Sequence, residues 1–261
     1  MKFLAVIGDP IKHSRSPRIH NNAIKTLNLK AIYSRYHLKD AKLLKEKIFK
    51  LGLIGANITL PFKEEALKIA DFKDEFALNI GSANTLCVKE NKIYAYNTDA
   101  FGFLEAIKEF KELKKALILG AGGTALAIAY ALKSKGIEVL IANRSEKRFL
   151  DFKAYKTSLY ENLNEFKFDI VINSTSAGLS DENLPCEENL LRKILSNSKY
   201  AFEVIYGKQT PFLRLCKEFK LPCKDGLDML LWQGVFAFEL FFDIKDKRQV
   251  IKNSMQAALK L

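Results

Sequence analysis

The chain has 261 residues, of which 48% are hydrophobic and 28% charged, a balance typical of a globular protein and not of a disordered one. This length is enough for one large domain or two of ordinary size. The longest apolar stretch, residues 230–242, contains Gln233 and Glu239 and is shorter than the ~20 residues that span a bilayer. The apolar run at residues 3–7 is too short for the core of a signal peptide. We therefore expect a cytoplasmic protein that does not enter a membrane.

The net charge of +12 and the pI near 9.4 raise the question of a nucleic-acid partner. The lysines are spread over the whole chain and mixed with glutamates, and no basic run contains interleaved aromatic residues. We expect no nucleic-acid binding, although a positive field would attract an anionic substrate. The four cysteines and three histidines show no metal-ligand spacing, so we expect reduced thiols and no metal.

Short β-type runs alternate with helical patterns along the chain, which predicts α/β architecture with parallel strands. In the first half the predicted strands are residues 3–8, 32–36 and 55–58, followed by a hairpin of 85–89 and 93–96. Helices are predicted to begin at Pro17, near Lys39 and at Pro61. We place a domain change near residue 100.

The second half begins with a predicted helix at residues 100–111. A strand, a helix and a strand follow, at residues 116–120, 122–135 and 138–142. Two further strands and two C-terminal helices complete the prediction, at residues 169–173, 201–205, 226–242 and 246–259.

The strand predicted at 116–120 runs into a glycine turn and then a helix, the arrangement G-x-G-x-x-A with Gly120, Gly122 and Ala125. Glycines allow the tight turn, and the N–H groups at the start of the helix can bind a pyrophosphate. Such turns are common, but here the next strand also arrives about 20 residues later, as in a dinucleotide-binding unit.

The end of that next strand indicates which dinucleotide binds. An NAD site uses an acidic residue there to bond the ribose 2′-hydroxyl. This chain has Asn143-Arg144-Ser145, with Arg148 one turn further on. A guanidinium can bind a 2′-phosphate with two parallel hydrogen bonds, so we favour NADP. The alternative is that both arginines are solvated and Ser145 only caps a helix.

Two segments of the first half carry candidate substrate groups. Ser16 is predicted to be the N-cap of the helix at Pro17, and together with Ser14 it can form a receptor for a carboxylate; the alternative is capping alone. Lys63 is predicted in the first turn of the next helix, where the dipole disfavours a cation by ~0.3–1 kcal/mol. Neighbouring glutamates could offset this cost, or Asp99 could hold Lys63 for chemistry. For Asn97-Thr98-Asp99 itself, an N-cap is the alternative.

Taken together, these segments resemble the shikimate dehydrogenase family over nearly the whole chain and in the same order. The matching stretches are residues 8–21, 57–63, 81–85, 97–99, 120–123, 143–145, 173–175 and 226–234. Among the departures, Glu203 stands where the family usually has aspartate.

The resemblance implies two α/β domains. Residues 1–100 would form a substrate domain, to which a C-terminal helix at about 237–261 returns, and residues 101–236 a doubly wound, Rossmann-type NADP domain. Lys63 and Asp99 would be the catalytic pair. The substrate would be held by Ser14, Ser16, Thr59, Lys63, Asn84, Asp99, Tyr206 and Gln233. NADP would be bound by Gly120, Ala121, Gly122, Gly123, Thr124, Asn143, Arg144, Ser145, Arg148, Val204 and Gly226.

Gln233 also stands out without the resemblance, because it is a polar amide in an otherwise apolar helix and needs a partner, either a backbone group or a ligand hydroxyl.

The reaction that the resemblance implies is the reversible reduction of 3-dehydroshikimate to shikimate by NADPH, on the chorismate route to aromatic amino acids, by a monomer or a homodimer. Three alternatives stay open: a quinate-preferring relative that uses NAD, a two-domain dehydrogenase of folate one-carbon units, and a non-catalytic NADP-binding sensor.

Overall fold

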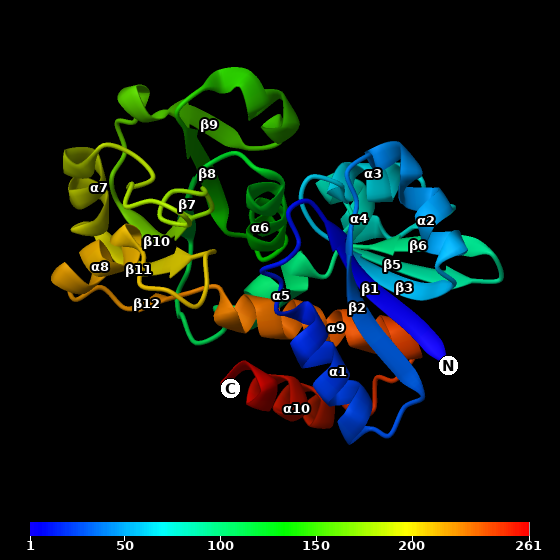
Figure 1. The fold of residues 1–261 in the computed structure, drawn as a ribbon. Helices are drawn as coiled ribbons and strands as arrows, with labels where there is room; N and C mark the ends of the chain where they lie inside the picture. Colours follow the sequence, from blue (N-terminus) through cyan, green and yellow to red (C-terminus); the bar gives the residue numbers. More distant parts are fainter. Residues whose placement is uncertain (261) are drawn as a thin grey trace. The chain divides into compact units, whose positions relative to one another are not determined.

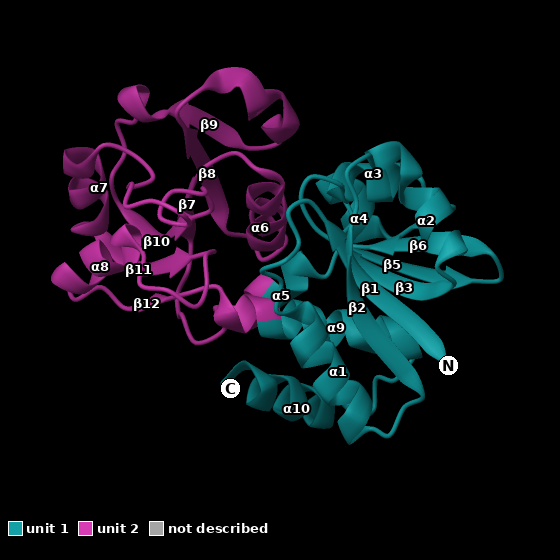
Figure 2. Ribbon diagram, in the orientation of Figure 1, with its two compact units in different colours: residues 1–102, 231–261 teal, residues 103–230 magenta. Residues whose placement is uncertain are grey.

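The structure is a computed structural model that describes residues 1–260. The chain divides into two compact units, one formed by residues 1–102 and 231–261 and the other by residues 103–230 (Figure 2). Their boundaries fall within the helices α5 (Asp99–Ala106) and α9 (Leu227–Phe242). We call them unit 1 and unit 2.

Unit 1 contains a six-stranded sheet in the order β2-β1-β3-β5-β6-β4 (Figure 1). The strands are β1 (Lys2–Gly8), β2 (Ala31–His37), β3 (Leu53–Ile58), β4 (Phe72–Lys73), β5 (Thr85–Lys89) and β6 (Lys92–Tyr96). β1 pairs in parallel with β2 and β3, whereas β5 runs antiparallel to β3 and β6. The predicted hairpin is confirmed, and it makes this sheet mixed instead of wholly parallel.

Both faces of this sheet are covered by helices. Side chains alternate between the faces of a strand, and in β1 Leu4 and Val6 join one buried cluster while Ala5 and Ile7 join another. The first cluster includes residues of α9 and of α10 (Arg248–Lys260), and Asn22 donates a hydrogen bond to the Ser254 carbonyl of α10 at 2.7 Å. The C-terminal helix therefore packs within unit 1. The remaining helices of unit 1 are α1 (Ser16–Thr26), the 3₁₀ turn η1 (Ala41–Leu43), α2 (Leu44–Lys50), α3 (Lys63–Lys68) and α4 (Glu75–Ile80).

Two predicted helix boundaries are wrong. The helix expected at Pro61 begins at Lys63, because the Phe62 N–H donates to the Thr59 carbonyl at 3.0 Å and closes a turn first. The helix expected over 100–111 ends at Ala106, and Phe110 N–H then donates to the Ile107 carbonyl at 2.8 Å in a turn. The helix expected near Lys39 is divided into η1 and α2.

Unit 2 contains a six-stranded sheet, parallel throughout, in the order β12-β11-β10-β7-β8-β9. Its strands are β7 (Lys115–Leu119), β8 (Glu138–Asn143), β9 (Lys156–Leu159), β10 (Phe168–Asn173), β11 (Ser198–Glu203) and β12 (Cys223–Lys224). Read from β9, this is the 3-2-1-4-5-6 order of a dinucleotide-binding fold, and the strand order reverses between β7 and β10. Ligands of such sheets bind at the carboxyl ends of the strands at this point.

Helices also pack against the sheet of unit 2. The cluster around Leu117 and Leu119 includes Leu191 and Leu215, from two helices that the sequence analysis did not predict. They are α7 (Glu188–Leu195) and α8 (Pro211–Glu218), which join α6 (Gly123–Lys133) and the 3₁₀ segments η2 (Glu146–Phe152) and η3 (Tyr160–Asn162). Among residues 1–260, no helix combines the length and the hydropathy needed to cross a membrane.

Candidate active site

Lys63 and Asp99 form an ion pair in unit 1. Lys63 is the first residue of α3 and Asp99 the first residue of α5. The Lys63 Nζ atom lies 2.6 Å from Asp99 Oδ2, and the two side chains are only 13% and 11% exposed. Asp99 thus offsets the unfavourable position of a lysine at the start of a helix. Removing one partner of such a pair leaves the other charge buried and uncompensated.

Asp99 does not act as the N-cap of α5. It is the first residue of the helix, and its own N–H donates to Asn97 Oδ1 at 3.2 Å. The second carboxylate oxygen of Asp99 instead accepts a hydrogen bond from Asn84 Nδ2 at 2.8 Å. Both oxygens of Asp99 are therefore held by side chains of the predicted site, Lys63 and Asn84.

Ser14 and Ser16 lie together at the start of α1. The Ser14 hydroxyl donates to Ser16 Oγ at 3.2 Å and accepts from the Ser16 N–H at 3.3 Å. The prediction of Ser16 as N-cap is wrong: Arg15 occupies that place and no side chain caps the helix. The Ser14 carbonyl accepts two hydrogen bonds from the Arg35 guanidinium, at 3.0 and 2.6 Å, which fixes the loop. This leaves a helix N-terminus next to two hydroxyls, a suitable receptor for a carboxylate.

The remaining predicted substrate residues come from separate elements. Thr59 follows β3 and packs against Gly8, where an added Cβ would lie 2.4 Å from the Thr59 methyl carbon. Gln233 lies on α9 and is 9% exposed. Tyr206 belongs to unit 2, where it follows β11. The roles of these three residues in substrate binding stay predictions.

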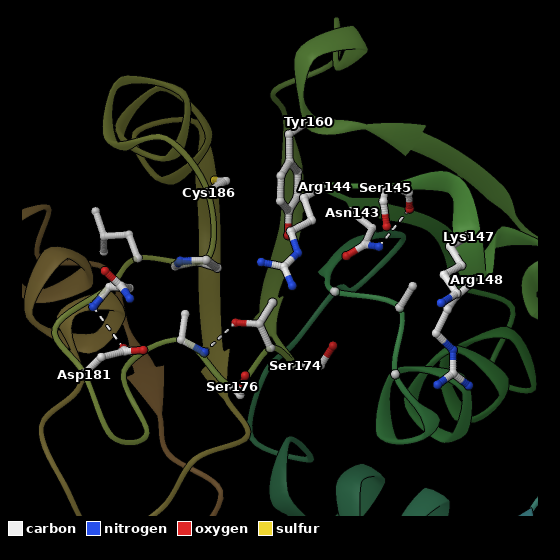
Figure 3. A pocket seen from close by; sticks show the side chains of 18 residues that line it. Asn143, Arg144, Ser145, Lys147, Arg148, Tyr160, Ser174, Ser176, Asp181 and Cys186 are labelled. Carbon is white, nitrogen blue, oxygen red and sulfur yellow. Dashed lines mark hydrogen bonds between the residues drawn. The ribbon is translucent and has the colours of Figure 1, made fainter.

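Unit 2 contains a pocket of about 770 Å³ at the carboxyl ends of β7, β8 and β10 (Figure 3). Seven predicted cofactor residues line it: Gly120, Ala121, Gly122, Asn143, Arg144, Ser145 and Arg148. Gly123 and Thr124 are the first residues of α6, directly after Gly122, whereas Val204 and Gly226 are not among the lining residues. Gly226 is instead packed so tightly that an added Cβ would lie 2.1 Å from the Val204 carbonyl oxygen.

Several other residues that line this pocket are not predictable from the glycine turn or the arginine motif. They include Lys147, Tyr160, Ser174, Thr175, Ser176 and Asp181. A signal was present for three of them, because Ser174 to Ser176 directly follow β10, the strand next to β7 at the reversal of strand order.

The glycine turn is shaped for a pyrophosphate. Gly120 has a φ of +100°, and an added Cβ would lie 2.9 Å from the Thr175 methyl carbon, so both backbone and neighbours require glycine. At Gly122 and Gly123 an added Cβ would meet no described atom within 4 Å. That open space lies over the N-terminus of α6, whose first turn contains no acidic residue. The cradle therefore fits a bound anion.

Arg144 and Arg148 differ in their surroundings. The Arg148 guanidinium forms an ion pair with Asp151 at 3.1 Å. The Arg144 guanidinium makes no ion pair or hydrogen bond with another residue of the described chain, and Figure 3 shows it beside Tyr160 in the pocket. Asn143 Nδ2 donates to the Ser145 carbonyl at 2.9 Å and holds the turn between them. An unpaired guanidinium in a pocket is suited to a phosphate group.

Known proteins resemble the chain throughout its length. Residues 6–86 match the shikimate dehydrogenase substrate binding domain, residues 105–190 the shikimate / quinate 5-dehydrogenase family, and residues 226–256 the shikimate 5′-dehydrogenase C-terminal domain. The chain belongs to the shikimate dehydrogenase family. The shikimate dehydrogenase (NADP(+)) of Helicobacter hepaticus is 48% identical over 244 residues, which cover 92% of this chain and 90% of that protein. The shikimate dehydrogenase (NADP(+)) of Helicobacter pylori strain P12 is 41% identical over 92% of each chain.

A solved structure agrees with these sequence matches. The shikimate 5-dehydrogenase of Thermus thermophilus in complex with NADP(H) and shikimate is 32% identical to this family member. The match covers 99% of this chain and all of that one, with a TM-score of 0.86. It supports the predicted α/β fold and the predicted NADP dependence.

One departure from the family pattern, Glu203, is buried at the end of β11 and 0% exposed. Its carboxylate accepts hydrogen bonds from the Asn173 amide at 2.8 Å, the Thr210 hydroxyl at 3.0 Å and the Ile205 N–H at 3.0 Å. Burial outweighs these donors and raises the pKa of Glu203 to about 7. The cluster holds Asn173, whose Oδ1 atom in turn accepts from the Thr175 hydroxyl in the pocket wall at 2.7 Å.

Proposed function

We propose that this chain catalyses the NADPH-dependent, reversible reduction of 3-dehydroshikimate to shikimate. The observation that carries the proposal is the buried Lys63–Asp99 pair, in which a cation and a carboxylate are fixed in one geometry in a member of this family. A non-catalytic NADP-binding sensor would need the glycine turn and Arg144 but not this pair.

The substrate carboxylate is received by the hydroxyls of Ser14 and Ser16, next to the positive end of the α1 dipole. When bound, NADPH supplies the hydride that reduces the substrate carbonyl. The Lys63 ammonium, oriented by Asp99, stabilises the negative charge that develops on the carbonyl oxygen and is the proton donor for it. In the opposite direction Lys63 accepts the proton of the reacting hydroxyl.

The cofactor is held by groups of unit 2. The N–H groups of Gly122 to Thr124 at the start of α6 would hold the pyrophosphate, and Arg144 would hold the 2′-phosphate. Ser174 and Thr175 line the same pocket, and their hydroxyls donate to the Leu119 carbonyl at 2.8 Å and to Asn173 Oδ1 at 2.7 Å, which fixes the pocket wall.

The test is an assay of the purified chain with four combinations: shikimate or quinate, each with NADP⁺ or NAD⁺. Reduction of NADP⁺ by shikimate with the largest kcat/KM is the expected result. A preference for quinate or NAD⁺ would identify the quinate-type relative instead. Tight NADPH binding without turnover of either substrate would indicate a sensor and overturn the proposal.

A further inference from the structure

Behind Asp99 lies a set of buried polar side chains that the reaction scheme does not use. Asn57 is 6% exposed, Thr85 0%, Thr98 2% and Asn84 3%. Burying so many amides and hydroxyls is costly unless each is hydrogen-bonded. They are bonded to one another, and the set ends at the Asp99 carboxylate.

The orientation of the Asn84 amide is fixed. Its Oδ1 atom accepts from the Thr98 N–H at 2.8 Å, a backbone group that can only donate. Its Nδ2 atom must therefore face the other way, where it donates to Asp99 Oδ1 at 2.8 Å and to Thr98 Oγ1 at 3.0 Å. Both amide hydrogens of Asn84 are occupied within the protein, which favours positioning of Asp99 over direct contact with a ligand.

Thr85 is the centre of the set. Its hydroxyl donates to Asn84 Oδ1 at 3.0 Å, accepts from Asn57 Nδ2 at 3.1 Å and lies 3.2 Å from Thr98 Oγ1. Asn57 Oδ1 in turn accepts from the Tyr33 hydroxyl at 2.7 Å. Tyr33 is 2% exposed, and its ring stacks on that of His20 with centroids 4.2 Å apart.

The donors of this hydrogen-bonded series all point in one direction. Tyr33 donates to Asn57, Asn57 to Thr85, Thr85 to Asn84, and Asn84 to Asp99. Hydrogen bonds aligned in this way polarise one another, and the negative charge of Asp99 at the end strengthens the last of them.

We propose that Thr85 is a positioning residue for the reaction: through Asn84 it fixes the orientation of Asp99 and thereby of Lys63. Tyr33 and Asn57 support the same role from one and two bonds further away. This inference rests on the proposed function, because it needs a reaction in which the Lys63–Asp99 geometry limits the rate.

Thr85→Val tests it, since valine keeps the shape of threonine and lacks the hydroxyl. The variant leaves Asn84 without the Thr85 donor and Asn57 without its nearest acceptor, so Asn84 is held only by Thr98 and orients Asp99 less tightly. We expect kcat for shikimate oxidation to fall about tenfold, the equivalent of 1.4 kcal/mol in the barrier. The KM values for shikimate and NADP⁺ should change less than about twofold, because no group that binds them is removed. Thr85→Ser, which restores the hydroxyl, should return kcat to within about threefold of the wild type.

Two further variants separate positioning from folding. Thr26→Val is the matched control in unit 1, since the Thr26 hydroxyl is bonded to Ser254 Oγ at 2.8 Å, in a different polar cluster, and its kcat should equal that of the wild type. Tyr33→Phe breaks the series at its far end, so its loss in kcat should be smaller than that of Thr85→Val. It also serves as the test if Thr85→Val does not fold.

In an Asp99→Asn background, Thr85→Val should cost no further activity, because the group that it positions is already disabled. The inference is overturned if Thr85→Val, or Tyr33→Phe in its place, keeps kcat within twofold of the wild type. It is also overturned if Thr85→Val lowers kcat equally with and without Asp99. Lack of shikimate turnover by the wild-type chain would instead overturn the proposed function.

Discussion

The polar groups of the two sites differ in whether they already have hydrogen-bond partners within the protein. Around Asp99 in unit 1 they are buried and bonded to one another, so that Lys63, Asp99 and Asn84 hold a fixed arrangement. In the pocket of unit 2 the Arg144 guanidinium and the open space over Gly122 are left for a ligand. A site whose polar groups are already hydrogen-bonded to one another can stabilise a transition state without reorganising. A site whose polar groups lack partners gains them from the molecule that it binds. Substitutions in the first should lower kcat, and those in the second should raise KM.

The largest effect is expected for Lys63→Ala. A group that serves only the transition state lowers kcat and kcat/KM together, and losing a positioned proton donor typically costs about 10²–10⁴-fold. NADPH affinity, measured by fluorescence titration, should be unchanged. Lys68→Ala is the matched control, because Lys68 lies on the same helix and is exposed.

A Lys63→Ala variant that keeps near-normal kcat would contradict this assignment. Melting curves are needed beside the kinetics, because loss of activity through unfolding would support a structural role for the ion pair instead.

A smaller effect, on a different constant, is expected for Arg144→Ala. Loss of a charge-assisted hydrogen bond costs about 1.5–3 kcal/mol, so the KM for NADP⁺ should rise roughly tenfold to 100-fold while that for NAD⁺ stays nearly constant. Arg148→Ala should do less, since Asp151 already pairs with Arg148. Equal increases for both cofactors would show that Arg144 does not bind the 2′-phosphate.

Ser14→Ala combined with Ser16→Ala should raise the KM for shikimate about tenfold, because the hydroxyls of the receptor are lost. The matched measurement uses a shikimate analogue without the carboxylate, whose binding should hardly change. Equal losses for both ligands would indicate that the serines only shape the loop.

The smallest effect on catalysis is expected for Glu203→Gln. This substitution should instead change how the free energy of unfolding depends on pH. The native pKa of about 7 lies above the ordinary value of 4.5, so the native state binds the proton more tightly than the unfolded state. Its contribution to stability is fully present below pH 4.5 and is lost as the pH rises to about 7, a change of about 3 kcal/mol.

Glutamine cannot titrate, so the free energy of unfolding of the wild type minus that of Glu203→Gln should fall across this window. Urea unfolding of both proteins at several pH values between 4 and 8 measures the difference. A difference that is constant with pH would show that the pKa of Glu203 is not raised by folding.

Features of the structure can be predicted from the sequence where a short, local sequence pattern determines them. The Gly120 turn and the β5–β6 hairpin could be predicted because short patterns dictate them. The helices α7 and α8 were missed although both are amphipathic, because each has only 8 residues and so repeats its apolar pattern over little more than two turns. The site itself was predicted from resemblance, and the direct Lys63–Asp99 contact joins residues 36 positions apart.

Other features could not be predicted because they depend on tertiary contacts. Ser16 looks like an N-cap, yet its hydroxyl accepts a hydrogen bond from Ser14 and does not cap the helix. The hydrogen bonds of Thr85 join β5 to Asn57 on β3 and to Thr98 before α5. No local sequence pattern predicts such contacts.

The central claim is that Lys63 and Asp99 act as one unit, and a double-mutant cycle in kcat tests it most directly. Steady-state kinetics at saturating shikimate and NADP⁺ would be measured for Lys63→Ala, Asp99→Asn and the double variant, with melting curves for each. If the two groups work only together, the double variant should be about as slow as the slower single variant. If the two losses multiply, the residues act independently and the central claim is contradicted.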